Sequence, residues 1–154
     1  MSAIMPATHT SNRKYALAVT LVFTVVAMIA GPNGPLGGFW RPTPTVAPPS
    51  GALLPLFILL NIAEALAFGL GIAFLLFGYP LVRDVAPVSA GLARGAHLSI
   101  AWLLINWWPH DSLHLHVGLN LGSLIVVEYV FHITLMLAGV VLAYFFMALF
   151  RRPS

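Results

Sequence analysis

Five ionisable side chains lie near the middle of long apolar stretches of this sequence: Glu64, Arg94, His97, Glu128 and His132. A charged group at bilayer depth costs about 3 kcal/mol on insertion scales, so such groups usually face the interior of a helix bundle and indicate a functional site. Carboxylates and imidazoles also bind transition metals and exchange protons near neutral pH. The residue types therefore predict a polar site inside a membrane protein.

The spacing of these residues predicts that they share helix faces. Glu128 and His132 are four residues apart and Arg94 and His97 are three apart, so each pair lies one helical turn apart on one face. Small residues accompany His97 and Glu64 at the same spacing, a pattern that lets membrane helices approach closely. Counted inward from the expected helix ends, all five lie roughly 12–18 Å deep. We therefore expect them to meet at one level.

Metal binding is the first chemistry that this set could perform. Glu64, His97, Glu128 and His132 would form a shell of imidazoles and carboxylates that suits copper, iron or zinc, or two of the histidines would bind haem. Arg94 would balance the carboxylate charge, and Tyr129 could donate a hydrogen bond beside Glu128. The chain has no cysteine, so any metal here must use histidine and carboxylate.

A second group of possible ligands follows two tryptophans, in the segment Trp107-Trp108-Pro109-His110-Asp111-Ser112-Leu113-His114-Leu115-His116. His110 and His114 share a face if the segment is helical, and His114 and His116 share one if it is extended. Either pair could chelate a divalent metal, with Asp111 as a further ligand or as a partner that orients a ring. A segment at the membrane interface whose histidines only contact headgroups is the alternative.

An ion-pair network explains the deep cluster equally simply. In that interpretation Arg94 lies between Glu64 and Glu128, and the histidines act as neutral donors and acceptors or as a proton relay. The chain would then be a non-catalytic accessory subunit of a larger membrane complex, in contact with other subunits or with a second copy. The residues leave open whether the protein is an enzyme.

Composition assigns the chain to the integral membrane proteins. Its 154 residues are 60% hydrophobic and only 7% charged, with a mean hydropathy of +0.94. The net charge of +3 comes from residues near the ends of apolar segments, so it indicates orientation rather than nucleic-acid binding. The sequence has no phosphate-binding loop, nucleophile elbow or HExxH pattern, which argues against the corresponding hydrolases.

The elements that must position the cluster are four transmembrane helices in an all-α bundle. We expect spans at about residues 15–30, 52–78, 85–107 and 119–150, a cytoplasmic tail at 1–14 and another at 151–154. The first span is interpreted as an uncleaved anchor, although a signal peptide is the alternative. Prolines and glycines in residues 31–50 predict a loop.

Orientation follows from the positive residues. Arg13, Lys14, Arg83 and the final arginine pair fall on one side if four helices alternate in direction, so both termini are expected in the cytoplasm. The histidine-rich loop at residues 108–118 would then face outward. Trp107 and Trp108 would lie at the outer interface, where amphipathic rings prefer to be.

Overall fold

The computed structural model describes residues 8–85 and 88–150, with side chains from residue 12 onward, and within these ranges the chain is helical and has no strand. The predicted all-α class is confirmed. The predicted tail at 151–154 and the first part of the tail at 1–14 lie outside the described residues, whereas residues from Thr8 onward belong to the first helix.

The elements follow one another as rods joined by short connections. Their bounds are α1 Thr8–Ala30, the 3-10 turn η1 Gly37–Trp40, α2 Leu54–Phe77, α3 Tyr79–Val85, α4 Ala90–Ile105, α5 Trp107–Val117, α6 Leu121–Glu128, the π-helical turn η2 Tyr129–Ile133 and α7 Thr134–Phe150. Three helical stretches are long and apolar enough to cross a membrane: residues 12–30, 54–77 and 121–150. These stretches support integration into a membrane.

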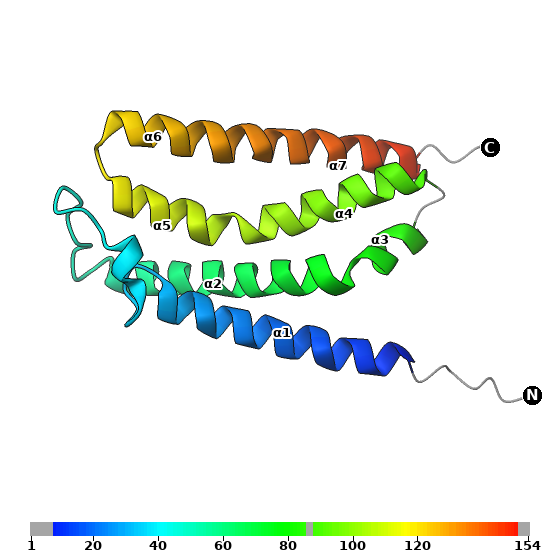
Figure 1. Cartoon of the computed structure of the whole chain (residues 1–154), viewed down its shortest axis with the longest axis horizontal. Coiled ribbons are helices and arrows are strands. Elements are labelled where there is room, and N and C mark those ends of the chain that lie inside the picture. Colours follow the sequence, from blue (N-terminus) through cyan, green and yellow to red (C-terminus); the bar gives the residue numbers. More distant parts are fainter. Residues whose placement is uncertain (1–7, 86–87, 151–154) are drawn as a thin grey trace, which may run out of the picture.

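The rods pack side by side in chain order and form a row (Figure 1). The extensive contacts join α1 to α2, α2 to α4, and α4 to α7. The approach of α2 and α4 depends on a residue without a side chain, because a Cβ at Gly71 would lie 2.9 Å from the backbone nitrogen of Ile105. Gly71 belongs to the small-residue pattern beside Glu64 that the sequence shows.

The third rod consists of α4 and α5. It is longer than expected and bent, because α5 continues from the end of α4. Residues 108–118, predicted as a loop, are almost entirely helical. Pro109 has no N–H to donate to the preceding turn, which interrupts the helix at Asn106 without ending the rod. The backbone N–H of His110 resumes the helical pattern by donating to the Asn106 carbonyl at 3.0 Å. The α5–α6 connection is therefore only a few residues long.

The start of the third rod also differs from the prediction. Residues 85–107 were expected to form one helix, but Tyr79–Val85 is a separate short helix and α4 begins at Ala90. Ser89 caps α4, since its hydroxyl accepts a hydrogen bond from the backbone N–H of Leu92 at 3.2 Å. The last rod runs from Leu121 to Phe150 and contains the π-helical turn next to Glu128.

Candidate functional site

Two histidines on α5 begin the candidate site. His110 and His114 lie one turn apart, their Nε2 atoms are 2.9 Å apart, and their rings meet edge to face with centroids 4.4 Å apart. A hydrogen bond between two ring nitrogens requires one of them to carry a proton and the other to be free of it. His110 is buried, whereas about a third of the His114 side chain is exposed. The pair is thus a donor–acceptor couple on one helix face.

The last rod brings a carboxylate and a third histidine against this pair. Glu128, at the end of α6, places Oε1 3.5 Å from Nε2 of His114 and Oε2 2.5 Å from Nδ1 of His132. The His132 ring lies 5.2 Å from that of His110, centroid to centroid. The predicted association of Glu128 and His132 on one helix face is present, and each oxygen of the carboxylate contacts a different imidazole.

The aromatic side chain of Phe131 holds the two rods together beside the histidines. It is 6% exposed, its ring centroid lies 5.0 Å from that of His110, and it stacks on Trp102 at 5.9 Å. The Trp102 indole donates a hydrogen bond of 3.0 Å to the hydroxyl of Thr134 at the start of α7. The π-helical turn η2 contains Phe131, and such turns often occur at functional sites.

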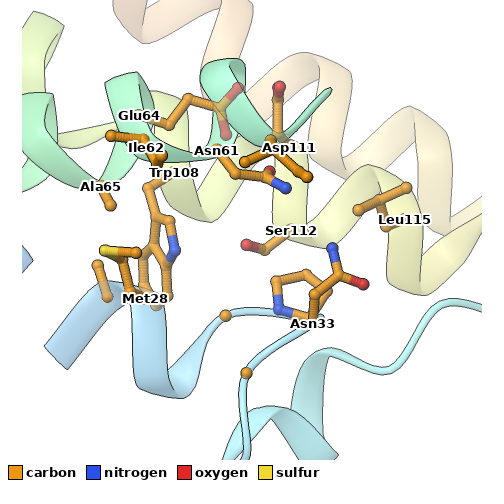
Figure 2. A pocket seen from close by; sticks show the side chains of 15 residues that line it. Met28, Asn33, Asn61, Ile62, Glu64, Ala65, Trp108, Asp111, Ser112 and Leu115 are labelled. Atoms are coloured by element: carbon orange, nitrogen blue, oxygen red, sulfur yellow. The ribbon is translucent and has the colours of Figure 1, made fainter. Parts of the chain in front are cut away.

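On its other side, His110 contacts one carboxyl group, which lies beside a second one. Nδ1 of His110 is 3.3 Å from Oδ1 of Asp111, which is within ion-pair distance, although the two are not aligned for a hydrogen bond. Asp111 in turn lies beside Glu64 of α2, and both side chains line one cavity (Figure 2). Glu64 is 8% exposed. The close contacts therefore form a continuous path from Glu64 on α2, through α5, to His132 on the last rod.

Two residues of the predicted cluster lie elsewhere. His97 is buried, but its Nε2 hydrogen-bonds the Phe74 carbonyl at 2.9 Å, and its ring packs against Phe74 and Tyr79. Arg94 is exposed and, among the described residues, makes no ion pair with Glu64 or Glu128. Both were assigned to the deep cluster because the third helix was expected to end at residue 107. The added length of α5 places α4, and with it these two residues, toward the opposite end of the rods (Figure 1).

Two further predicted residues also lie outside the path. His116 faces the loop after α1, where Nδ1 is 3.3 Å from the Arg41 carbonyl and the ring stacks on Phe39 at 5.9 Å. The Tyr129 side chain is 65% exposed, and it makes no side-chain hydrogen bond within the described ranges. His116 therefore does not pair with His114 as a ligand, and Tyr129 does not donate to Glu128.

The predicted metal shell is not formed as a unit. Within residues 8–85 and 88–150, no group of three or more His, Asp or Glu side chains is arranged to hold one metal ion. His97 lies apart beside Phe74 and Tyr79, and Glu64 and Glu128 are separated by Asp111, His110 and His114. The set of residues brought into contact is instead His110, His114, Glu128 and His132, with Asp111 and Glu64 continuing from it.

Two further polar residues support the site, Asn106 at a helix end and Asp111 beside the histidines. Asn106 is fully buried and donates from Nδ2 to the Trp102 carbonyl at 2.6 Å, next to the bend between α4 and α5. Asp111 was assigned to the histidines alone, whereas it also joins Glu64. The position of Asp111 follows from the helix that continues past Pro109. Adjacent residues on a helix point in different directions, so His110 and Asp111 face different neighbours.

Comparison of the chain with protein-family models, with curated proteins and with solved structures gives no match in any of the three.

Proposed function

We propose that the protein crosses the membrane four times, with α1, α2, the bent α4–α5 rod and the α6–α7 rod as the crossings and both termini in the cytoplasm. Three stretches meet the length and hydropathy of a span, and α4 adds a shorter apolar helix that α5 extends. The start of α1, which carries Arg13 and Lys14, and α3, which carries Arg83, lie at one end of the rods, and the loop after α1, which carries Arg41, lies at the other (Figure 1).

Within this arrangement, we propose that the protein is an accessory subunit that relays protons sideways through its outer half to a partner. The single observation that supports the relay is the series of close contacts from Asp111 through His110, His114 and Glu128 to His132, with Glu64 beside Asp111 in the same cavity wall. Each contact joins two groups that can exchange a proton, and imidazoles do so near neutral pH. His114 can accept a proton from His110 and release it to Glu128.

The exposure of the last groups supports a partner. The side chains of Glu128 and His132 are 37% and 51% exposed, although they lie about two to three turns inside the last rod. Polar groups at that depth are costly against lipid. A neighbouring transmembrane helix, from another subunit or a second copy, would cover them and receive the proton. The path begins on α2, in the middle of the row of rods. It ends on the last rod, at the partly exposed side chains of Glu128 and His132.

Coupled titration tests the relay. The full-length protein in nanodiscs, labelled with ¹⁵N-histidine, should show His110, His114 and His132 titrating as an interacting set, because a proton on one changes the charge felt by the next. Glu128→Gln, which keeps the shape and removes the charge, should shift the titrations of both His114 and His132. His97 provides an internal control and should titrate unchanged, since Phe74 is its partner.

Independent, single-site titration of the three histidines, unaltered in Glu128→Gln, would refute the relay. If Glu128→Gln does not fold, His114→Asn provides the same test, because it should remove the link from His110 to Glu128 through His114 while leaving the Glu128–His132 pair intact.

A metal or haem group is the second candidate function, and one observation favours it. The Nε2 atoms of His110 and His114 and the Oε1 atom of Glu128 are separated by 2.9 and 3.5 Å along the path, which is the spacing of neighbouring ligands around a copper, iron or zinc ion with bonds of about 2 Å. Binding such an ion would require the side chains to turn toward a common point, because among the described residues no three possible ligands surround one point. Two of these imidazoles are also the available axial ligands for haem.

Metal analysis and absorption spectra of the purified protein separate the two functions. Stoichiometric metal, or a haem absorption band, that disappears in His114→Ala would replace the relay by a metal or haem site. Protein with no bound metal that still shows the coupled titration would support the relay alone.

A further inference from the structure

A cavity of about 240 Å³ lies on the other side of Asp111, between α1, α2, α5 and the loop that follows α1. Figure 2 shows Glu64 and Asp111 together on one wall, the Trp108 indole on another, and Asn33 of the loop opposite. The loop approaches closely because Gly31 has no side chain, and a Cβ there would lie 3.3 Å from the indole nitrogen of Trp108. The cavity belongs to α1, α2 and α5 and does not include the three histidines of the path.

The charge of the cavity is one-sided. Glu64 and Asp111 come from different helices and lie side by side in the cavity wall (Figure 2), and none of the described lining residues is a lysine, an arginine or a histidine. Two carboxyl groups this close cannot both be ionised without a compensating positive charge. The pair therefore either shares a proton or contacts a cation in the cavity.

A buried hydroxyl adds an independent indication of a ligand. Ser112 is 2% exposed, and its hydroxyl points into the cavity in Figure 2. None of the side-chain hydrogen bonds among the described residues uses that hydroxyl. The side-chain amides of Asn61 and Asn33 also line the space. A buried polar group without a protein partner is normally satisfied by water or a ligand, so the cavity presents acceptors to an occupant that can donate.

The remaining walls are apolar. They come from Ala27, Met28, Ile58, Ile62, Ala65 and Leu115, together with the Trp108 ring. The volume is below the usual range for drug-sized ligands and well above that of a bare metal ion. An aromatic ring and aliphatic walls suit the carbon atoms of a ligand, and a tryptophan face also attracts a cation.

We propose that this cavity binds a small organic cation, a protonated amine with a short aliphatic chain. Its ammonium group donates hydrogen bonds to Glu64, Asp111 and Ser112, and its carbon chain packs against Trp108 and Met28. This site does not require the relay, because its walls would bind the amine whether or not His110 exchanges protons with His114. Occupancy would nevertheless change the charge beside His110, which contacts Asp111.

Binding of n-propylammonium to the full-length protein in nanodiscs tests the proposal. The signal of Trp108 is followed by ¹⁹F NMR after 5-fluorotryptophan labelling and is assigned with Trp108→Phe. We expect a saturable shift with n-propylammonium chloride and none with 1-propanol, which has the same chain without the charge. Glu64→Gln should weaken binding at least tenfold, and Ser112→Ala should weaken it several-fold.

Asp84→Asn is the matched control, because it removes an exposed carboxylate on α3 far from the cavity, and it should leave the affinity unchanged. Asp111→Asn replaces Glu64→Gln if the latter does not fold. Equal shifts with 1-propanol, full affinity in both carboxamide variants, or no shift of Trp108 would overturn the proposal. Saturation of the Trp108 shift by sodium or calcium chloride at lower concentration than the amine would overturn it in favour of an inorganic cation.

Discussion

The two ends of the α4–α5 rod each contain a buried histidine, but only one of them is connected to other titratable groups. His97 on α4 has a backbone carbonyl as its hydrogen-bond partner and aromatic rings around it. His110 on α5 contacts Asp111 and His114 and, through them, the acids of two other rods. A backbone carbonyl cannot gain or lose a proton, so His97 can stabilise the packing of α2 and α4 but cannot transfer a proton onward.

Burial therefore does not distinguish a structural histidine from a functional one in this protein. The exposed fractions of His97 and His110 are both 7%. The difference lies in the partners that the neighbouring helices provide. The predictions below test whether the connected end behaves as a unit and the other end as a single contact.

The largest effect is expected where the connected end depends on packing. Phe131→Ala removes a ring that is 6% exposed and touches both His110 and Trp102, and should lower the free energy of unfolding by about 3 kcal/mol through the cavity it leaves. It should also broaden the His110 signal in ¹⁵N spectra. Unfolding in mixed micelles provides the measurement. Phe146→Ala, on the 48% exposed ring of Phe146 in α7, is the control and should cost less than half as much.

His97→Ala should have an intermediate effect. It removes the hydrogen bond to the Phe74 carbonyl and leaves a void beside Tyr79, so the free energy of unfolding should fall by about 1–2 kcal/mol. The titrations of His110, His114 and His132 should remain as in the unmodified protein. A change in any of those titrations would show that the two ends communicate, and the comparison between them would fail.

A smaller energy is expected for the contact between His114 and Glu128. The atoms are 3.5 Å apart and both side chains are about one-third exposed, so the interaction energy in a double-mutant cycle should be about 0.6 kcal/mol, the average for polar contacts between membrane helices. The cycle combines His114→Ala, Glu128→Ala and the double variant, with unfolding in mixed micelles. Strict additivity would mean that the path is broken between α5 and α6.

The helical fold class and the three long apolar helices could be read from the sequence because apolar length decides them. The boundaries of α2 and of the last rod were predicted within a few residues, since both are uninterrupted apolar runs. The bent rod was not predicted correctly, because Pro109 and a polar run of histidines have the composition of a loop. Residues 107–117 are nevertheless helical, and they pack against α2 and α6.

That single error redistributed the candidate site. Extending the third rod by α5 moves Arg94 and His97 by roughly 15 Å along the helix axis relative to the expected level, at 1.5 Å per residue. Glu128 and His132 stayed together because their four-residue spacing depends on local helix geometry alone. Contacts within one helix could thus be predicted from the sequence, whereas contacts between helices depend on register, which one misplaced boundary changes.

Arg94 gives the smallest expected effect and the sharpest contrast with the sequence-based interpretation. An arginine between two buried carboxylates would cost several kcal/mol to remove, because the acids would be left unpaired. In the structure Arg94 is exposed in the second turn of α4, at the end opposite to the path. Arg94→Gln should therefore change the free energy of unfolding by less than about 0.5 kcal/mol and leave the ¹⁵N titrations unchanged. A loss of more than 2 kcal/mol, or altered titration of His114, would instead place the guanidinium within the polar path. An exposed side chain at the opposite end of the rods has no other way to affect that path.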